Sequence, residues 1–187
     1  MAVTVQACKT EKTAAFRRLV SDIRAVVQSQ RDSSHIGAAV AELLRPYLGS
    51  DDFLRCDQLA TAECDYCQHI LHVEPDGSFS IVALVWLPGQ ATAIHDHVSW
   101  CVVGVHKGEE HETIYTRSGS NGDAHLQLAG EYINPPGSVA TCIPPGDIHQ
   151  VANRGDGVAV SLHIYGADIG VLGSSIRRRY DLEVRAV

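Results

Sequence analysis

A chain of 187 residues with 45% hydrophobic and 20% charged residues has the composition of one globular domain, spanning residues 1–187. Its formal net charge of −7 argues against nucleic acid or an anionic membrane surface as main partners, because both require basic patches. No apolar run approaches the roughly 20 residues that a membrane span needs. The sequence therefore argues against a membrane-spanning helix and against nucleic acid or a membrane surface as a partner.

The cysteine content bears on the cellular compartment. An even count is compatible with disulfides, but residues 1–12 lack the apolar core of a secretion signal. A chain with a sufficient core does not need disulfides, so reduced thiols in the cytoplasm are the prediction. The six cysteines are Cys8, Cys56, Cys64, Cys67, Cys101 and Cys142.

The first part of the chain, residues 1–50, is predicted to be helical. Apolar residues recur at helical spacing from Phe16 to Val27, with charged residues between them. Asp32 then offers a cap ahead of a second apolar run, and Pro46 ends that run. We expect two consecutive helices between residues 12 and 48.

From about Tyr66 the pattern changes to short apolar or alternating runs separated by Gly, Pro, Asn and Asp clusters. Many short strands with turn signals at regular intervals predict a barrel or sandwich over residues 66–166. Residues 167–187 are expected to form a C-terminal tail. The predicted strands cover residues 70–73, 79–86, 100–105, 112–115, 138–143 and 158–165.

A possible metal site begins with His95-Asp96-His97. On a strand both imidazoles project to the same face, because side chains alternate with period two, whereas Asp96 points the other way. His149, from a distant strand, can complete a set of three nitrogen ligands with open positions for other molecules. Imidazole ligation suits Fe, Zn, Cu or Ni, so these residues alone do not choose the metal.

A polar row lies near the end of the predicted barrel. Ser161, His163 and Tyr165 alternate with apolar residues, so on a strand all three face one side. We expect Ser161 to bond one ring nitrogen of His163 and the Tyr165 hydroxyl to bond the other, which fixes the imidazole tautomer. Such a row is typical of a strand that lines a cavity.

Two segments resemble the paired motifs of the cupin superfamily. The resemblance implies a mainly β fold, the cupin double-stranded β-helix (jelly-roll) barrel, preceded here by N-terminal α-helices. Cys101 stands where many cupins carry a ligand glutamate, so three neutral imidazoles would leave the charge of a bound metal uncompensated. The first motif is matched by Gly89, His95, His97 and Gly108, and the second by Pro144, Gly146, His149 and Asn153.

The combination of the three histidines with Ser161-x-His163-x-Tyr165 is similar to the cysteine dioxygenase family of thiol dioxygenases. This resemblance implies an enzyme that uses Fe(II) and O2 to oxidise a small thiol to a sulfinic acid. It makes His95, His97 and His149 the iron ligands and Ser161, His163 and Tyr165 an outer-sphere catalytic triad. The resemblance covers residues 66–165, more than half of the chain.

Members of that family differ in the residue that receives the substrate carboxylate. Gln68 takes the position of the arginine of cysteine-specific enzymes, which resembles the bacterial branch that prefers 3-mercaptopropionate or handles several thiols, including cysteine. In that branch a later arginine compensates. Arg177, Arg178 and Arg179 are the candidates, and Arg178 is the preferred one.

Two further alternatives stay open from the sequence. By resemblance, Cys101 and Tyr165 are placed to form a thioether cross-link, although a small buried thiol also explains Cys101. The rival functional classes are another metal-dependent cupin oxygenase and a non-catalytic cupin that binds a metal or small ligand. The oligomeric state is not indicated by these patterns.

Overall fold

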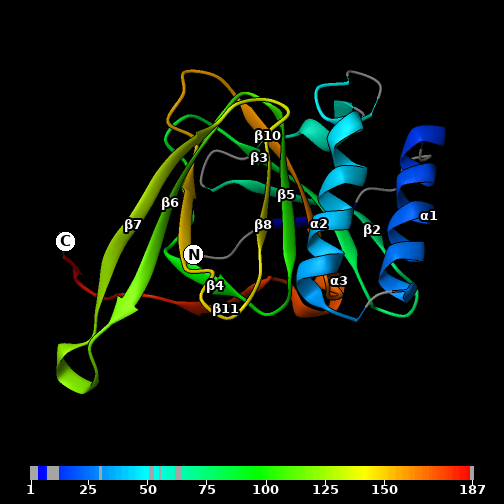
Figure 1. Cartoon of the computed structure of the whole chain (residues 1–187). Coiled ribbons are helices and arrows are strands. Elements are labelled where there is room, and N and C mark those ends of the chain that lie inside the picture. The colour runs from blue at the N-terminus through cyan, green and yellow to red at the C-terminus, as the bar shows by residue number, and fades with distance from the viewer. Residues whose placement is uncertain are drawn as a thin grey trace.

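The computed structural model describes residues 4–7, 13–29, 31–50, 53–54, 56–61 and 65–185. Helices cover one side of two facing sheets, and the hairpin of strands β6 (Glu110–Ser118) and β7 (His125–Asn134) extends away from the opposite side (Figure 1). No helix within these ranges is long and apolar enough to cross a membrane. The arrangement is the double-stranded β-helix with N-terminal helices that the sequence predicts.

The two N-terminal helices are α1 (Ala14–Ser29) and α2 (Ser33–Leu44), followed by a 3-10 turn over Arg45–Tyr47. The Asp32 side chain accepts a hydrogen bond from the His35 amide, which caps the free end of α2. Both helices bury one apolar face against a sheet, as their spacing predicts. The two-helix prediction is confirmed.

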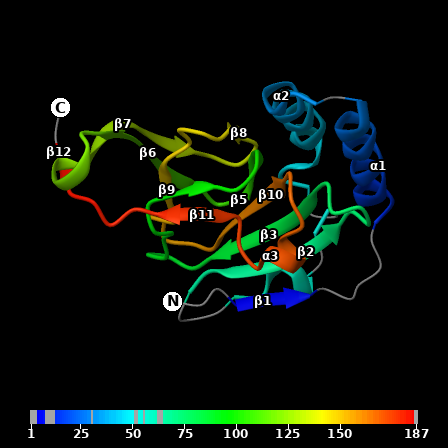
Figure 2. The ribbon, with the colours of Figure 1, turned by 90° about the horizontal axis from the view of Figure 1, so that it is seen from below.

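The first sheet has the strand order β1-β2-β3-β10-β5-β8. The central strand β10 lies between β3 and β5 and pairs antiparallel with both. The short β1 lies at the edge, parallel to β2 (Figure 2). The strands are β1 (Thr4–Ala7), β2 (Cys67–Val73), β3 (Ser80–Trp86), β5 (Cys101–Lys107), β8 (Val139–Cys142) and β10 (Ala159–Tyr165).

The second sheet has the strand order β11-β4-β9-β6-β7-β12. Its centre brings β4 and β9 together, although their segments lie about 50 residues apart in the chain. The strands are β4 (His95–His97), β6 (Glu110–Ser118), β7 (His125–Asn134), β9 (His149–Ala152), β11 (Ile176–Arg179) and β12 (Val184–Arg185).

Alternation along β10 divides the interior into two apolar clusters. Leu162 and Ile164 face the helices and join the cluster that contains Leu19 and Ile23. Tyr165 faces the space between the sheets and joins a second cluster with Trp86 and Cys101. The polar residues of β10 therefore project between the sheets, where β4 and β9 also present their histidines.

The helices approach the first sheet closely at Gly104 of β5. A Cβ atom at this position would lie 2.7 Å from the Leu44 side chain and 2.9 Å from that of Leu48. The absence of a side chain thus lets the end of α2 lie directly on the sheet. This contact holds the helical layer against β5 and leaves the opposite face of the strand for the site.

The sheets extend beyond the core predicted for residues 66–166. The expected tail 167–187 contains the short helix α3 (Ile169–Leu172) and strands β11 and β12, and β1 precedes the helices within the predicted helical part. The ten-residue β7 was also missed, because half of its residues are exposed and its alternation is weak. The C-terminal residues therefore belong to the second sheet, and β11 borders the site.

Candidate metal centre

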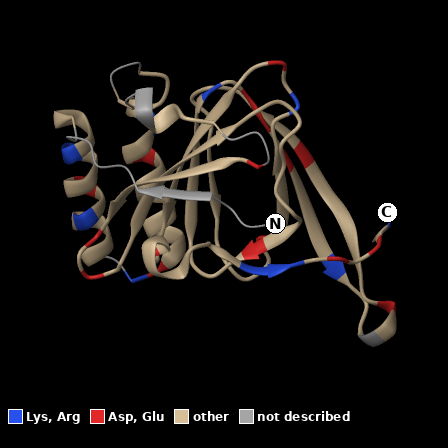
Figure 3. Cartoon of the chain, turned by 180° about the vertical axis from the view of Figure 1, so that it is seen from behind, with Lys and Arg blue, Asp and Glu red and all other residues tan. Residues whose placement is uncertain are grey.

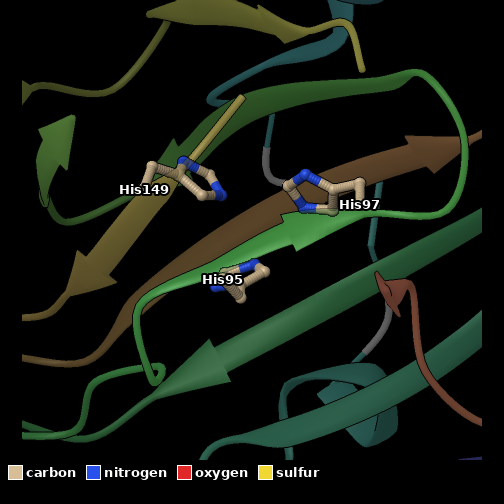
Figure 4. Close-up of side chains that lie close together, drawn as sticks. All are labelled: His95, His97 and His149. Atoms are coloured by element: carbon tan, nitrogen blue, oxygen red, sulfur yellow. The ribbon is translucent and has the colours of Figure 1, made fainter. Parts of the chain in front are cut away.

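Three histidines converge in the space between the two sheets (Figure 4). His95 and His97 come from β4, and His149 lies opposite His95 in the β4–β9 pair, so all three side chains share one face. Each ring offers a nitrogen, and these nitrogen atoms lie within 4.8 Å of one another. All three residues are at most 4% exposed, so the group is shielded from bulk water.

Oxygen atoms behind the rings fix how each imidazole is turned. Each Nδ1 lies within hydrogen-bond distance of one oxygen: Ala93 O at 2.9 Å from His95, Asp147 Oδ2 at 2.8 Å from His97 and Glu112 Oε1 at 2.7 Å from His149. With a proton on Nδ1, the Nε2 lone pair remains free on the inner side. Carboxylates behind ligand imidazoles are a typical feature of metal sites.

The donor set fits a divalent transition metal. Nε2 of His149 is buried and has no hydrogen-bond partner within the described ranges, which is what a missing metal ligand bond leaves behind. Burial, together with His149 and His97, lowers the pKa of His95 to about 3, so its ring is neutral at neutral pH. Neutral imidazoles are the form that binds metal.

A second close group consists of Glu112, Cys142 and His149. Its Glu112 oxygen already accepts from His149 Nδ1, so these residues support the first group from behind. Burial raises the pKa of the Cys142 thiol well above its usual value, which keeps this thiol protonated and a poor ligand. The three histidines are therefore the set that fits a metal.

The polar row of β10 borders the same space. Ser161 Oγ lies 2.9 Å from His163 Nε2, and Tyr165 Oη lies 3.0 Å from His163 Nδ1. These are the two hydrogen bonds expected from the sequence. Burial lowers the pKa of His163 well below the usual value of a histidine. Burial also raises the pKa of Tyr165 well above the usual value of a tyrosine, so both groups are neutral at neutral pH.

Cys101 lies beside this row on β5. It pairs with Tyr165 on one side and with Cys142 on the other, and its Sγ atom lies 4.0 Å from His163 Nδ1. The residue is fully buried, and burial raises the pKa of its thiol. The register thus makes Cys101 and Tyr165 direct cross-strand neighbours.

A narrow cavity of about 20 Å³ connects the histidines with the polar row. Gln68 of β2 lines it and is 6% exposed, and its Nε2 atom is buried without a hydrogen-bond partner in the described part of the chain. A buried amide donor without an acceptor is costly, so a ligand that supplies an oxygen here would satisfy it. The cavity is further lined by Tyr66, Leu84, Trp86, Thr92, Val151, Ser174, Ser175 and Ile176.

Strand β11 brings three arginines next to β4, where a basic stretch lies against an acidic one (Figure 3). A register shift between Ile176 and Arg178 places Arg178 opposite Asp96 and Arg179 opposite His95. Because paired residues share a face, Arg179 lies on the histidine side and Arg178 on the outer side.

The outer side of β4 is occupied by an ion-pair cluster. Asp96 Oδ2 accepts from Arg177 Nη2 at 2.6 Å and from the Tyr180 hydroxyl at 2.8 Å. Arg178 Nε lies 3.8 Å from the same oxygen, and its guanidinium lies over the Tyr180 ring. Asp96 therefore points away from the metal site, as predicted, and the structure places the preferred Arg178 with it rather than in the cavity.

Sequence reasoning missed the carboxylates behind the imidazoles. Asp147 lies two residues before His149 within the second motif, so its position was a usable signal. Glu112 comes from β6, and no local pattern connects it with His149. Both hydrogen bonds arise from strand pairing and loop packing, which the sequence pattern does not show.

The fold is that of a cupin, and its three-imidazole group is able to hold a metal ion. Three solved structures are similar over part of the chain. The protein TT1209 from Thermus thermophilus is 21% identical, with 61% of this chain and 95% of that one covered and a TM-score of 0.45. A cupin superfamily protein from Desulfitobacterium hafniense is 18% identical, with 65% of this chain and 95% of that one covered and a TM-score of 0.45. A Cupin 2 conserved barrel domain protein from Salinispora arenicola is 18% identical, with 62% of this chain and 88% of that one covered and a TM-score of 0.43.

Family membership follows from the sequence profile of cysteine dioxygenase type I, which matches residues 7–171. The match covers most of the chain and includes the three histidines and the polar row. The chain belongs to the cysteine dioxygenase type I family.

Proposed function

We propose that this protein is a thiol dioxygenase that adds both atoms of O2 to the sulfur of a small thiol carboxylate, giving the sulfinic acid. The observation that carries the proposal is the shared cavity. It is lined by three histidines that lack a carboxylate ligand and by His163 and Tyr165 of the polar row, with Ser161 bonded to His163. Membership in the cysteine dioxygenase type I family supports the reaction class.

We assign Fe(II) to His95, His97 and His149. When bound, Fe(II) supplies a redox-active Lewis acid at which a thiolate and O2 come together. The three imidazoles are neutral ligands, so they favour an anionic thiolate as a further ligand. Asp147 and Glu112 hold the rings of His97 and His149 in place from behind.

The carboxylate of the substrate is assigned to the end of the cavity formed by β2 and β11. The unpartnered Nε2 of Gln68 is a ready donor for one carboxylate oxygen. Arg179 shares the histidine face of the β4–β11 pair, and its charge opposes the rise of the Tyr66 pKa to about 12, which burial causes. The register thus favours Arg179 over Arg178 as the compensating arginine.

The neutral Gln68 amide and the partly solvated Arg179 guanidinium suit a substrate carboxylate that has no ammonium group next to it. Cysteine-specific binding by an arginine in place of Gln68 would be bidentate and charge-assisted, whereas Gln68 offers a single neutral bond. We therefore assign a 3-mercaptopropionate-like thiol, with cysteine as a second substrate. The chain resembles the bacterial glutamine-type branch in this respect.

Tyr165 is assigned the role of hydrogen-bonding the reacting groups. Its hydroxyl lies next to the histidines, with the ring centroids of Tyr165 and His97 6.3 Å apart. His163 and Ser161 orient this hydroxyl through their own hydrogen bonds. The buried row also excludes bulk water from this side of the cavity.

We propose that Cys101 and Tyr165 form a thioether after aerobic turnover, which their position as direct neighbours across β5 and β10 supports. Joining sulfur to the ring carbon removes two hydrogen atoms, for which O2 is the oxidant. Peptide mapping after turnover tests the link: a joined peptide about two mass units lighter than the sum is expected, from the two hydrogens lost. Separate unmodified Cys101 and Tyr165 peptides would exclude it.

An oxygen-electrode assay with anaerobically iron-loaded protein tests the proposed function. A panel of 3-mercaptopropionate, L-cysteine, cysteamine and mercaptosuccinate is expected to give the fastest uptake with 3-mercaptopropionate and slow uptake with cysteamine, which has no carboxylate. Failure to consume O2 with every thiol, despite full iron loading, would instead favour a non-catalytic metal-binding protein. Oxygen uptake that needs a carbon substrate rather than a thiol would favour another cupin oxygenase.

A further inference from the structure

The ladder between β11 and β4 contains one residue more on the β11 side than on the β4 side. Ile176 pairs with His97, but the next pair along the ladder joins Arg178 to Asp96. Arg177 is therefore the extra residue of a bulge, which changes the face on which every later side chain of β11 lies. Bulges beside functional sites are a recurring means of re-aiming a side chain.

The bulge decides which arginine shares the histidine face of the ladder. In the observed register Arg179 lies opposite His95. Without the extra residue, pairing one by one from the start of the ladder would bring Arg178 to that place and Arg179 opposite Ile94. The two arginines would thus exchange faces, and the sequence hides this difference because either register presents an arginine to the site.

The Arg177 ion pair does not distinguish the two registers. Its Nη2 atom lies 2.6 Å from Asp96 Oδ2, and Arg177 would lie opposite Asp96 in a regular ladder as well. The Tyr180 hydroxyl donates to the same oxygen at 2.8 Å, which requires the Tyr180 side chain to lie on the outer face with Asp96. A slip by one residue would turn Tyr180 to the other face and break this bond.

Further contacts of Tyr180 also belong to the shifted register. Its amide donates to the Ile94 carbonyl oxygen at 2.9 Å. Its ring packs, together with Ile94 and Leu182, against an apolar cluster of the second sheet. The Arg178 guanidinium lies over the same ring, 5.4 Å from its centroid. Tyr180 thus collects contacts that would all be lost together if β11 slipped.

The burial of Asp96 strengthens the bond that it accepts from Tyr180. Asp96 is 1% exposed, and its Oδ1 atom has no hydrogen-bond partner among the described residues. Oδ2 therefore accepts both the Arg177 and the Tyr180 hydrogen bonds. A buried carboxylate that loses a donor is costly, so the Tyr180 hydroxyl holds its position more firmly than an exposed pair would.

We propose that Tyr180, through its bond to Asp96, is a positioning residue that holds β11 in the shifted register and so makes Arg179, not Arg178, the arginine that meets the substrate carboxylate. The inference rests on the proposed function for the carboxylate of the bound thiol. The register itself is a property of the chain and can be measured without a ligand. Tyr180 is not among the residues that line the cavity, so it acts through Arg179.

Amide hydrogen exchange tests the register without a ligand. In full-length protein loaded with diamagnetic Zn(II) and followed by NMR, the Tyr180 amide should exchange slowly, because it is bonded to the Ile94 carbonyl. Tyr180→Phe removes only the hydroxyl, and the amide of residue 180 should then exchange about tenfold faster, since a charge-assisted bond is lost. Tyr132→Phe, at an exposed site on β7, should leave this rate unchanged. Equal rates in Tyr180→Phe and the wild type would overturn the inference.

Anaerobic calorimetry with the same Zn(II)-loaded protein then asks which arginine meets the carboxylate. The probes are 3-mercaptopropionate and propane-1-thiol, which lacks the carboxylate, so the ratio of their affinities reports the carboxylate contact. In the native background Arg179→Ala should lower this ratio about tenfold, and Arg178→Ala by less than about twofold. In the Tyr180→Phe background the two penalties should come within about threefold of each other, because a slipped strand presents Arg178 instead.

A general loss of stability would not transfer the dependence from one arginine to the other. A penalty that stays with Arg179 alone in Tyr180→Phe would therefore contradict the inference. If Tyr180→Phe does not fold, deletion of one residue from the run 177–179 decides instead. The shortened strand has no extra residue, still places an arginine opposite His95 and should keep the native affinity ratio. Loss of the ratio in the deletion variant would overturn the assignment of the bulge. Equal binding of both thiols by the wild type would refute the proposed carboxylate recognition, whereas the exchange rates would still decide the register.

Discussion

The two ends of the cavity differ in how many of their polar groups already have partners. At the histidine end, each Nδ1 of His95, His97 and His149 is held by an oxygen of the protein. At the other end, Nε2 of Gln68 lacks a partner among the described residues and Arg179 is exposed. The histidine end is therefore preorganised for a metal ion, whereas the Gln68 amide at the other end has a free donor for an oxygen of the substrate.

This difference indicates a division of tasks. A preorganised ligand set binds its metal without rearrangement, so a change there is expected to remove the metal and all activity. The substrate end contributes one neutral donor and one solvated charge, whose removal should change affinity and selectivity rather than chemistry. Substitutions at the two ends therefore test the comparison directly.

The largest effect is expected for His149→Ala. Loss of one of three ligands removes the central donor of the site, so the variant should lose both iron and turnover. Metal analysis after anaerobic loading and the oxygen assay measure this, with His125→Ala as the control, since His125 is half-buried far from the site and its Nδ1 lies beside the Asp123 carbonyl oxygen. Retained iron with full activity would refute the assignment of His149.

Tyr165→Phe should keep the iron and lower kcat by about 100-fold or more, because only the hydroxyl that faces the reacting groups is removed. Iron content and kcat are measured together. Tyr132→Phe, at an exposed site on β7, serves as the control. Equal kcat in Tyr165→Phe and the wild type would mean that the polar row has no part in the reaction.

Asp147→Asn should weaken metal binding by about 10- to 100-fold, since an amide is a weaker acceptor for the Nδ1 proton of His97. Competition with a chelator measures the affinity. The exposed Asp156→Asn is the matched control. An unchanged affinity would show that the carboxylate does not orient His97.

Arg179→Ala is predicted to raise KM for 3-mercaptopropionate by about 10-fold, because a charge-assisted bond to the substrate carboxylate is lost. Arg178→Ala should change KM little, since the Arg178 side chain lies with Asp96 and Tyr180 on the outer side of β4. The reverse ranking in steady-state kinetics would restore Arg178 to this role.

Gln68→Arg is expected to have the smallest effect, a shift of roughly threefold in relative kcat/KM toward L-cysteine. The reason is that the introduced guanidinium can donate two parallel hydrogen bonds to the substrate carboxylate. The ratio of kcat/KM for cysteine and 3-mercaptopropionate is the measurement. An unchanged ratio would show that Gln68 does not determine the preference between the two thiols.

The histidine end was more predictable from the sequence than the substrate end. A two-residue period places His95 and His97 on one face, and the same rule aligns Ser161, His163 and Tyr165. The arginines depend on a register shift in β11, which moves Arg179 to the histidine face. A bulge is a product of strand pairing, so alternation in the sequence did not reveal it.

Tertiary pairing also explains the other omissions. Glu112 reaches His149 only because β6 lies beside β9 in the second sheet. The short edge strands β1, β11 and β12 have four residues or fewer, too few for a clear periodic pattern. Local patterns thus predicted which faces are polar, and strand order determined which of them meet.

Turnover under 18O2 tests the central claim most directly. Iron-loaded protein is mixed with 3-mercaptopropionate and the labelled gas, and the product is analysed by mass spectrometry. The account predicts a sulfinic acid that carries both 18O atoms, with one O2 consumed for each thiol. A disulfide, or a product with at most one labelled oxygen, would contradict it.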